Sequence, residues 1–479
     1  DNDLSRALDK PVVTSDDGMQ TLASFLGRVN YSLLGRYLLT ASVRSDGSSK
    51  FAEGNKWATF LSGALAWKAS EEEFIKRLGI FSNLKFRASY GETGNQGIGS
   101  YRSIAMLSTA NYPYGGSMAS GSALVSWRGP VSKDIRWETT RQYNLGVDMG
   151  FMQDRLTFTV DYYKKVTRDL LQEIQIPSST GFSNMLVNSG NVTNTGLELT
   201  GRWVAVSKRD FSWTVDGNIS FNKNEIGGLS GDQFANRLWY AADDVFIQRN
   251  GLPIGAMYGY VEDGFYDNEA EVRADPKYRD ATATKVLSMI GEIKYRDLNG
   301  DGDITADDRT VIGDTNPDFV YGLTNTINYK NFSMSFLLQG SYGNDIFNGT
   351  LWDIKLGNVG NITRDAYDTR WTAENKEGAK WPKATAGYNR TFLLSDRYIE
   401  DGSYLKLKNL SFSYRIPQPF KGVEQILVSL SASNLFTITN YSGYDPDVNA
   451  FGSDSSRRGV DVYSYPASRT VSLGINCIF

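Results

Sequence analysis

A run of closely spaced oxygen-bearing residues at 297–308, DLNGDGDITADD, is the strongest candidate for a chemical site in this sequence. Oxygen donors at positions 1, 3, 5, 7, 9 and 12 of the run come from Asp297, Asn299, Asp301, the Asp303 carbonyl, Thr305 and Asp308. Ca²⁺ prefers hard oxygen ligands at this spacing, and a glycine at position 6, here Gly302, permits the sharp turn that they require. The segment therefore predicts a calcium site.

The spacing matches the calcium loop of EF-hands and dockerins, with Asp308 at the last position in place of the bidentate Glu of EF-hands. Carboxylates this close together repel one another unless a cation lies among them. The alternative is a solvated acidic turn, because Asn, Gly and Asp are common turn residues. No helical pattern brackets the segment and no second copy exists, so we expect a structural ion that clips the loop 225–317 rather than a regulatory EF-hand.

Aromatic residues recur in the same long polar segments, where their rings could stack on sugars or pack against peptide side chains. The predicted contacts with substrate or with a partner protein are Tyr112, Tyr114, Trp239, Tyr240 and Trp352, and further aromatic candidates are Tyr258, Tyr260, Phe265, Tyr266, Trp371 and Trp381. The alternative is that these rings form the small cores that long loops need.

The composition argues against catalysis. The 479 residues include no histidine and a single cysteine, Cys477, so Ser-His and Cys-His pairs, the usual zinc sites and an internal disulfide are all missing. With 50 basic and 54 acidic residues, the net charge of −4 gives no general attraction for nucleic acid. We therefore expect a protein that is not an enzyme and does not bind nucleic acid.

Strict alternation of apolar with small or polar residues runs through the rest of the chain and predicts β-strands with one apolar face. In 211–222, for example, Phe211, Trp213 and Val215 lie on one track and Ser212, Thr214 on the other. Thirteen strands are predicted, at about 24–34, 37–45, 57–69, 83–91, 139–150, 155–167, 194–206, 211–224, 318–330, 332–342, 403–415, 424–436 and 468–479. Most can cross a bilayer at a tilt, for which about 9–11 residues suffice. A phase change within 403–415 predicts a β-bulge near Lys408.

The connections between these strands alternate in length. Short ones are 34–36, 152–154, 207–210, 330–331 and 416–423, with a somewhat longer one, expected to be helical, at 70–82. Long ones are 92–138, 168–193, 225–317, 343–402 and 437–467, with a shorter one at 46–56 on the same side. Short periplasmic turns and long extracellular loops are typical of an up-and-down barrel. A mean hydropathy of −0.37 and the lack of long apolar runs argue against membrane helices but not against such strands. The sequence thus predicts an all-β, transmembrane antiparallel barrel in the cell outer membrane, with its apolar track against lipid.

The odd number of strands gives a further expectation. With a periplasmic C-terminus, alternating directions make the strand at 24–34 run inward, whereas bacterial single-chain barrels have even strand numbers. We therefore expect residues 1–479 to be the C-terminal part of a larger barrel, with a plug and an N-terminal domain absent from this chain.

Longer sequence blocks spread over the chain carry a more specific signal. They are RYLLTASVRSDGSSKFAEGNKWATF at 36–60, LKFRASYGETGNQGIG at 84–99, WETTRQYNLGVDMGF at 137–151, RLTFTVDYYKK at 155–165, NVTNTGLELT at 191–200, RDLNGDGDITADDRTVIG at 296–313, QGSYGNDIFNG at 339–349, RYIEDGSYLKLKNLSFSYRIP at 397–417 and NLFTITNYSGYDPDVN at 434–449. In this order they resemble the SusC/RagA-type TonB-linked outer-membrane transporters of Bacteroidetes. The resemblance implies that the strands are the last thirteen of a 22-stranded barrel.

The resemblance also implies a function: TonB-dependent uptake of glycans or oligopeptides, with a SusD-like surface lipoprotein as a lid and TonB acting through the absent N-terminal plug region. The alternative is a soluble, calcium-dependent carbohydrate-binding β protein, which the aromatic loops and the calcium segment alone would support. The apolar track distinguishes the two, because a soluble sheet does not leave residues such as Phe211, Trp213 and Ile219 on a face that nothing covers.

Overall fold

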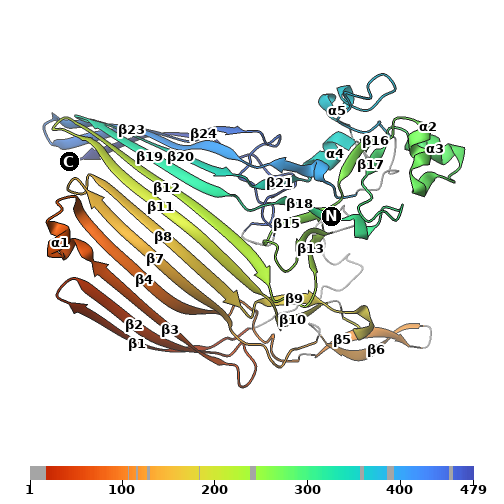
Figure 1. Ribbon diagram of the computed structural model, residues 1–479, viewed down its shortest axis with the longest axis horizontal. Coiled ribbons are helices and arrows are strands. Elements are labelled where there is room, and N and C mark those ends of the chain that lie inside the picture. Colours follow the sequence, from red (N-terminus) through yellow and green to blue (C-terminus); the bar gives the residue numbers. More distant parts are fainter. Residues whose placement is uncertain are drawn as a thin grey trace, which may run out of the picture.

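Thirteen antiparallel strands in one curved sheet form the body of the molecule (Figure 1). The structure is a computed structural model, and it describes residues 18–105, 107–114, 117–126, 130–182, 184–237, 244–356, 361–385, 393–452 and 457–479. The strands of this sheet are β1 (Leu22–Leu33), β2 (Tyr37–Ser48), β3 (Trp57–Lys68), β4 (Phe81–Asn95), β7 (Glu138–Phe151), β8 (Leu156–Arg168), β11 (Asn191–Ser207), β12 (Phe211–Gly227), β19 (Phe319–Tyr329), β20 (Phe332–Tyr342), β23 (Tyr404–Phe420), β24 (Val423–Thr439) and β26 (Thr470–Ile478). They follow one another across the sheet in chain order. The thirteen predicted strands and the up-and-down topology are confirmed.

Strand β23 contains one predicted irregularity and one departure from prediction. The register between β23 and β24 shifts between Leu407 and Asn409, so the bulge expected at Lys408 is confirmed. The strand then continues to Phe420, although the sequence predicted a turn over 416–423. Pairing of β23 with β20 ends at Tyr414, so that Pro417 pairs only with Gln425 of β24. A proline is tolerated in a strand that is unpaired on one side.

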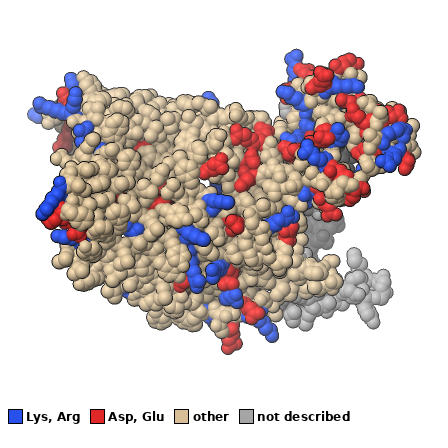
Figure 2. Space-filling model, viewed as in Figure 1, with Lys and Arg blue, Asp and Glu red and all other residues tan. Residues whose placement is uncertain are grey.

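The two faces of the sheet differ in chemistry. Apolar side chains of the predicted track, such as Leu65, Leu145 and Leu323, are exposed on the outward face. The opposite face carries ion pairs, in which Arg87 contacts Asp148 and Asp161 at 2.9 and 3.0 Å. Charged side chains gather at the short-turn end of the sheet and over the long connections, and the surface between these regions is mostly uncharged (Figure 2).

The long connections all leave the same end of the sheet, as predicted, and the short turns lie at the other end (Figure 1). The sequence described the long connections as loops, but they contain strands of their own. These are β5 (Leu107–Tyr114), β6 (Ser117–Ser126), β9 (Leu171–Gln175), β10 (Asn184–Asn188), β13 (Gln233–Arg237), β14 (Asp244–Gln248), β15 (Ala256–Gly259), β16 (Glu262–Phe265), β17 (Ile293–Tyr295), β18 (Thr310–Asp314), β21 (Asp345–Asn348), β22 (Ile399–Asp401) and β25 (Val460–Asp461). Most of them have five residues or fewer, so their alternation is too brief to detect.

The α-helices in the described ranges are short. They are α1 (Glu73–Lys76), which confirms the helical connection predicted over 70–82, and α2 (Glu269–Ala274), α3 (Ala283–Met289), α4 (Thr350–Leu356) and α5 (Arg364–Asp368). In the described ranges, no helix is long and apolar enough to cross a membrane.

We call the unit formed by β13–β18, β21, β22, β25 and α2–α5 the lobe. A hydrophobic core of its own holds it together, with buried Val245, Phe246, Met257, Phe347, Leu351, Leu394, Tyr398 and Val460. These residues come from loops that are far apart in sequence. The lobe is therefore a packed structure above one end of the sheet.

Candidate functional site

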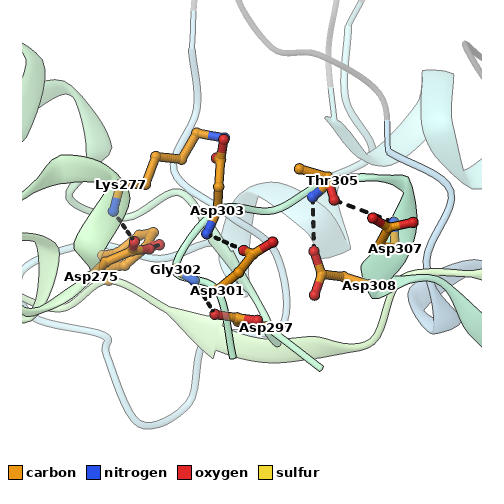
Figure 3. Close-up of polar contacts among 10 residues, drawn as sticks. Asp275, Lys277, Asp297, Asp301, Gly302, Asp303, Thr305, Asp307 and Asp308 are labelled. Carbon is orange, nitrogen blue, oxygen red and sulfur yellow. Dashed lines mark hydrogen bonds and ion pairs between the residues drawn. The ribbon is translucent and has the colours of Figure 1, made fainter. Parts of the chain in front are cut away.

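The predicted calcium segment, residues 297–308, forms a compact turn between β17 and β18 of the lobe (Figure 3). The two carboxylate oxygens of Asp297 accept hydrogen bonds from the N–H groups of Gly300 and Gly302, at 2.6 and 2.7 Å. Asp301 accepts one from the N–H of Asp303, at 2.8 Å. Gly302 has a φ of +84°, a conformation that side chains with a Cβ rarely adopt. The sharp turn inferred from this glycine is confirmed.

Asp308 closes the turn from its far end. Its carboxylate is fully buried and accepts hydrogen bonds from the N–H groups of Leu298 and Thr305, both at 2.8 Å. Burial raises the pKa of Asp308, but these backbone N–H groups outweigh it, and the pKa lies below its ordinary value. Asp308 is thus a charged, buried carboxylate that ties the beginning of the turn to its end.

The oxygen donors of residues 297–308 have the chemistry of cation ligands, but they are not gathered around one point. Within the described part of the chain, no group of three or more His, Cys, Asp or Glu side chains lies close enough together to hold a metal ion. The carboxylates of Asp297, Asp301 and Asp308 are directed toward backbone N–H groups. Carboxylate and amide oxygens nevertheless suit a hard cation, and each oxygen keeps a second lone pair. Calcium binding by residues 297–308 stays a prediction.

The turn packs against a neighbouring cavity of the lobe. Lys277 forms an ion pair with Asp303 at 2.7 Å, and a Cβ on Gly302 would approach the Pro276 side chain to 2.6 Å. The cavity has a volume of about 580 Å³, and its lining includes Lys277, Tyr278 and Ile304. Glycine at position 302 is therefore required by close packing as well as by its backbone conformation.

A buried lysine, which the sequence did not single out, fastens the last long connection to the sheet. Lys406 of β23 is 2% exposed and donates to both carboxylate oxygens of Asp445, at 2.9 and 3.2 Å. Asp447 lies 3.6 Å from the same ammonium group. The segment YDPDVN containing these aspartates was visible in the sequence, but a lysine on the polar track of a strand is expected to be solvated.

A second buried ion pair joins two of the long connections. Arg397 pairs with Glu262 of β16, and both side chains are almost fully buried. The guanidinium group also lies over the ring of Trp381, 5.2 Å from its centre. Connections 225–317 and 343–402 are thereby held in one body.

Comparison with known proteins identifies the family of this sheet and lobe. The family model described as TonB dependent receptor-like, beta-barrel, matches residues 3–288. The chain belongs to this family. The receptor is 35% identical over 475 residues to TonB-dependent receptor P3 of Formosa agariphila, with 96% of this chain and 45% of the relative covered. It is 32% identical over 470 residues to TonB-dependent receptor SusC of Bacteroides thetaiotaomicron, with 96% and 44% covered.

The receptor spans about half the length of the curated relatives it matches. Among solved structures, the RagAB peptide transporter superposes with a TM-score of 0.77 at 24% identity, over 95% of this chain and 47% of that one. This similarity shows a shared fold. The resemblance to SusC/RagA-type transporters is confirmed.

Membership of this family confirms the expected location in the outer membrane. The receptor is an outer-membrane β-barrel protein, so its outward residues, such as Phe158 and Phe221, face lipid. The alternative of a soluble carbohydrate-binding protein is therefore wrong. The matched relatives carry the names of receptors, which agrees with the expectation that the chain is not an enzyme.

The five predicted aromatic contacts cannot be placed at the level of side chains. Trp239 and Tyr240 lie outside the described residues, and Tyr112, Tyr114 on β5 and Trp352 on α4 lie where the structure describes the backbone alone. Contacts from these residues stay a prediction. Four of the further aromatic candidates, Tyr258, Tyr260, Tyr266 and Trp381, are buried, which favours the alternative that such rings form the core of the loops.

Proposed function

We propose that the receptor is a component of a TonB-dependent importer that takes up glycans or oligopeptides across the outer membrane. The observation that carries this proposal is the packing of the long extracellular connections into one lobe with its own core, above one end of a membrane-spanning sheet. A lobe built in this way can present a fixed surface to a nutrient and to a second protein. Both substrate classes rest on the resemblance of the sequence blocks to SusC/RagA-type transporters.

A SusD-like surface lipoprotein is the partner that we place on the lobe, where it would close over a captured substrate. TonB would supply energy from the periplasmic side. Both assignments rest on the resemblance of the sequence blocks and on the family of the relatives.

A depletion assay tests the transport proposal and separates its two substrate classes. Cells with and without the intact gene would receive a mixture of oligosaccharides and oligopeptides that are too large for porins, and consumption of each compound would be followed by mass spectrometry. We expect one class to remain in the medium of the deletion strain and of a strain without TonB. Uptake of a monosaccharide serves as the control and should not change. Consumption of every compound at the wild-type rate by either strain would contradict the proposal.

We also propose that residues 297–308 bind Ca²⁺ as a structural clip, with oxygens about 2.3–2.6 Å from one centre. Asp301→Ala should remove one ligand and open loop 225–317 locally, so that proteases cut this loop about 5-fold faster, the effect of losing about 1 kcal/mol of local stability. The barrel should keep its heat resistance, because its lipid-facing strands do not depend on the loop.

Asp307→Ala is the matched control, since Asp307 is an exposed neighbouring carboxylate that does not occupy a ligand position. Its cleavage rate should stay at the wild-type value. Equal cleavage of the unmodified receptor in calcium and in chelator would show that the segment is an acidic turn without a metal.

A further inference from the structure

An apolar groove lies on the outward face of the sheet, over β1–β4, β7 and β8. Its volume is about 740 Å³, and its lining includes Tyr37, Leu65, Trp67, Ala88 and Leu145. The side chains of these five residues all belong to the outward track. The groove therefore opens toward the membrane and is separate from the lumen.

A small residue between larger ones produces this groove. Ala88 is paired with Leu65 on one side and with Leu145 on the other. The two leucines are 60% and 59% exposed, so they stand above the alanine as walls. An apolar depression of this kind does not hold water, and an empty one would forfeit dispersion contacts for every atom of its lining.

The position of the groove along the strands assigns it to one leaflet. Ala88 lies seven residues beyond Phe81, where β4 leaves the short-turn end, and Leu65 lies three residues from the corresponding end of β3 at Lys68. Seven residues of a strand tilted by about 45° rise about 16 Å, which is close to half of a hydrocarbon core of about 30 Å. The Tyr37 and Trp67 row of the lining lies nearer the short turns than Ala88 does. Because the short turns are periplasmic, the groove extends from the periplasmic surface to about the middle of the bilayer and lies within the periplasmic leaflet.

Polar groups gather at the mouth of the groove. Glu72, which precedes α1, accepts hydrogen bonds from the Tyr37 hydroxyl at 2.7 Å and from the Trp67 indole N–H at 3.3 Å. It also accepts one from Nη1 of Arg36 at 2.8 Å. The Arg36 side chain is 33% exposed, and a guanidinium group has five N–H donors, so it can bind a second anion while it holds Glu72.

The connection that contains α1 presents apolar side chains next to this cluster. Phe74, Leu78 and Ile80 are all more than half exposed, although they lie beyond the ends of β3 and β4. Exposed apolar residues just beyond the ends of membrane-spanning strands, together with cationic ones such as Arg77, are typical of a segment that lies in the headgroup region of a bilayer. The mouth of the groove thus opens where lipid headgroups are expected.

We propose that this groove binds one glycerophospholipid of the periplasmic leaflet. One acyl chain lies over Ala88 between Leu65 and Leu145, and the phosphate accepts hydrogen bonds from Arg36. The lipid fills a hollow that side chains leave open and holds the α1 connection against the membrane. This binding site does not depend on which nutrient the receptor transports.

Retention of lipid by the purified receptor tests the proposal. The full receptor would be extracted from outer membranes, washed extensively in detergent and examined by native mass spectrometry, with the retained lipid identified after release. We expect one glycerophospholipid per chain. Ala88→Phe fills the floor of the groove and should abolish retention.

Ala432→Phe is the matched control. Ala432 also faces outward and is paired with Leu410 and Val471, but it lies on β24, outside the groove. This variant should keep the lipid. Both variants should show the wild-type change in gel migration on heating, which reports a folded barrel.

Two outcomes would overturn the site. One is an equal amount of phospholipid in the wild type and in folded Ala88→Phe, and the other is retention of a lipid A species, which would place the site in the outer leaflet. If Ala88→Phe does not fold, Arg36→Gln decides the matter, because it leaves the groove open and removes only the charge at its mouth. Undiminished retention by Arg36→Gln would then contradict the proposed phosphate contact and with it the site.

Discussion

Leu323→Arg should strongly destabilise the folded barrel in the outer membrane. Leu323 lies on the outward track of β19, six residues from the short-turn end at Tyr329, and is paired with Gly217 and Leu338. This position is near the middle of the bilayer. An arginine on the lipid face at this depth costs about 2–4 kcal/mol, or about 30-fold to 700-fold in the folding equilibrium. The fraction of heat-modifiable receptor, followed as urea is added, measures the loss as a lower midpoint of unfolding.

The neighbouring residue provides the control for this experiment. Thr324 points to the opposite face of β19 and is paired with Asp216, so an arginine there would meet a carboxylate in the polar interior. We expect Thr324→Arg to change stability by less than about 1 kcal/mol. Comparable losses for the two variants would contradict the assignment of the outward and inward faces.

The body of the fold was predictable because its signal is local. Every second residue of a spanning strand faces lipid, so a segment such as 211–222 displays its two faces within twelve letters. The same rule located the bulge at Lys408, where the alternation changes phase and the register shifts. Connection lengths then fixed which ends of the strands lie together.

The lobe could not be predicted, because its pairings are remote and its strands are short. Strand β21 pairs with β25 in parallel, so that Phe347 lies opposite Val460, more than 100 residues away. Lys406 and Arg397 likewise find their carboxylate partners in other connections. A sequence pattern shows that such residues are charged but not whether they are buried.

Some single-residue requirements also depend on contacts between strands. A Cβ at Gly146 would lie 2.6 Å from the guanidinium group of Arg87 and 2.5 Å from Asp161. The glycine lets Arg87 cross β7 and reach Asp161 on the next strand. The sequence of β7 contains the glycine, but only the pairing register explains it.

The candidate site was predictable in part. The spacing of oxygen donors in 297–308 correctly indicated a tight turn around Gly302, because Asp and Asn side chains bond to nearby N–H groups in such turns. The aromatic candidates were harder to judge. A tyrosine in a long loop has the same local sequence whether it contacts a substrate or, like Tyr258 and Tyr260, lies in a core.

The buried ion pair of Lys406 gives the second large expected effect. Removing one partner of a buried pair costs about 3–5 kcal/mol, because the remaining charge stays away from water without compensation. Lys406→Ala would leave the Asp445 carboxylate buried and without its cationic partner. This free-energy cost can be avoided only if the connection between β24 and β26 detaches from the sheet. We therefore expect rapid proteolysis within residues 440–469.

Lys408→Ala tests whether burial, rather than the loss of a positive charge, causes this effect. The Lys408 side chain is 36% exposed and lies 3.7 Å from Asp447, so removing this pair should cost no more than about 1 kcal/mol. Adding Asp445→Asn to Lys406→Ala should recover part of the protection, because a neutral amide takes the place of the stranded carboxylate. Cleavage in 440–469 that is equally fast in Lys406→Ala and Lys408→Ala, or unaffected by the second substitution, would mean that the Lys406–Asp445 pair does not fasten this connection.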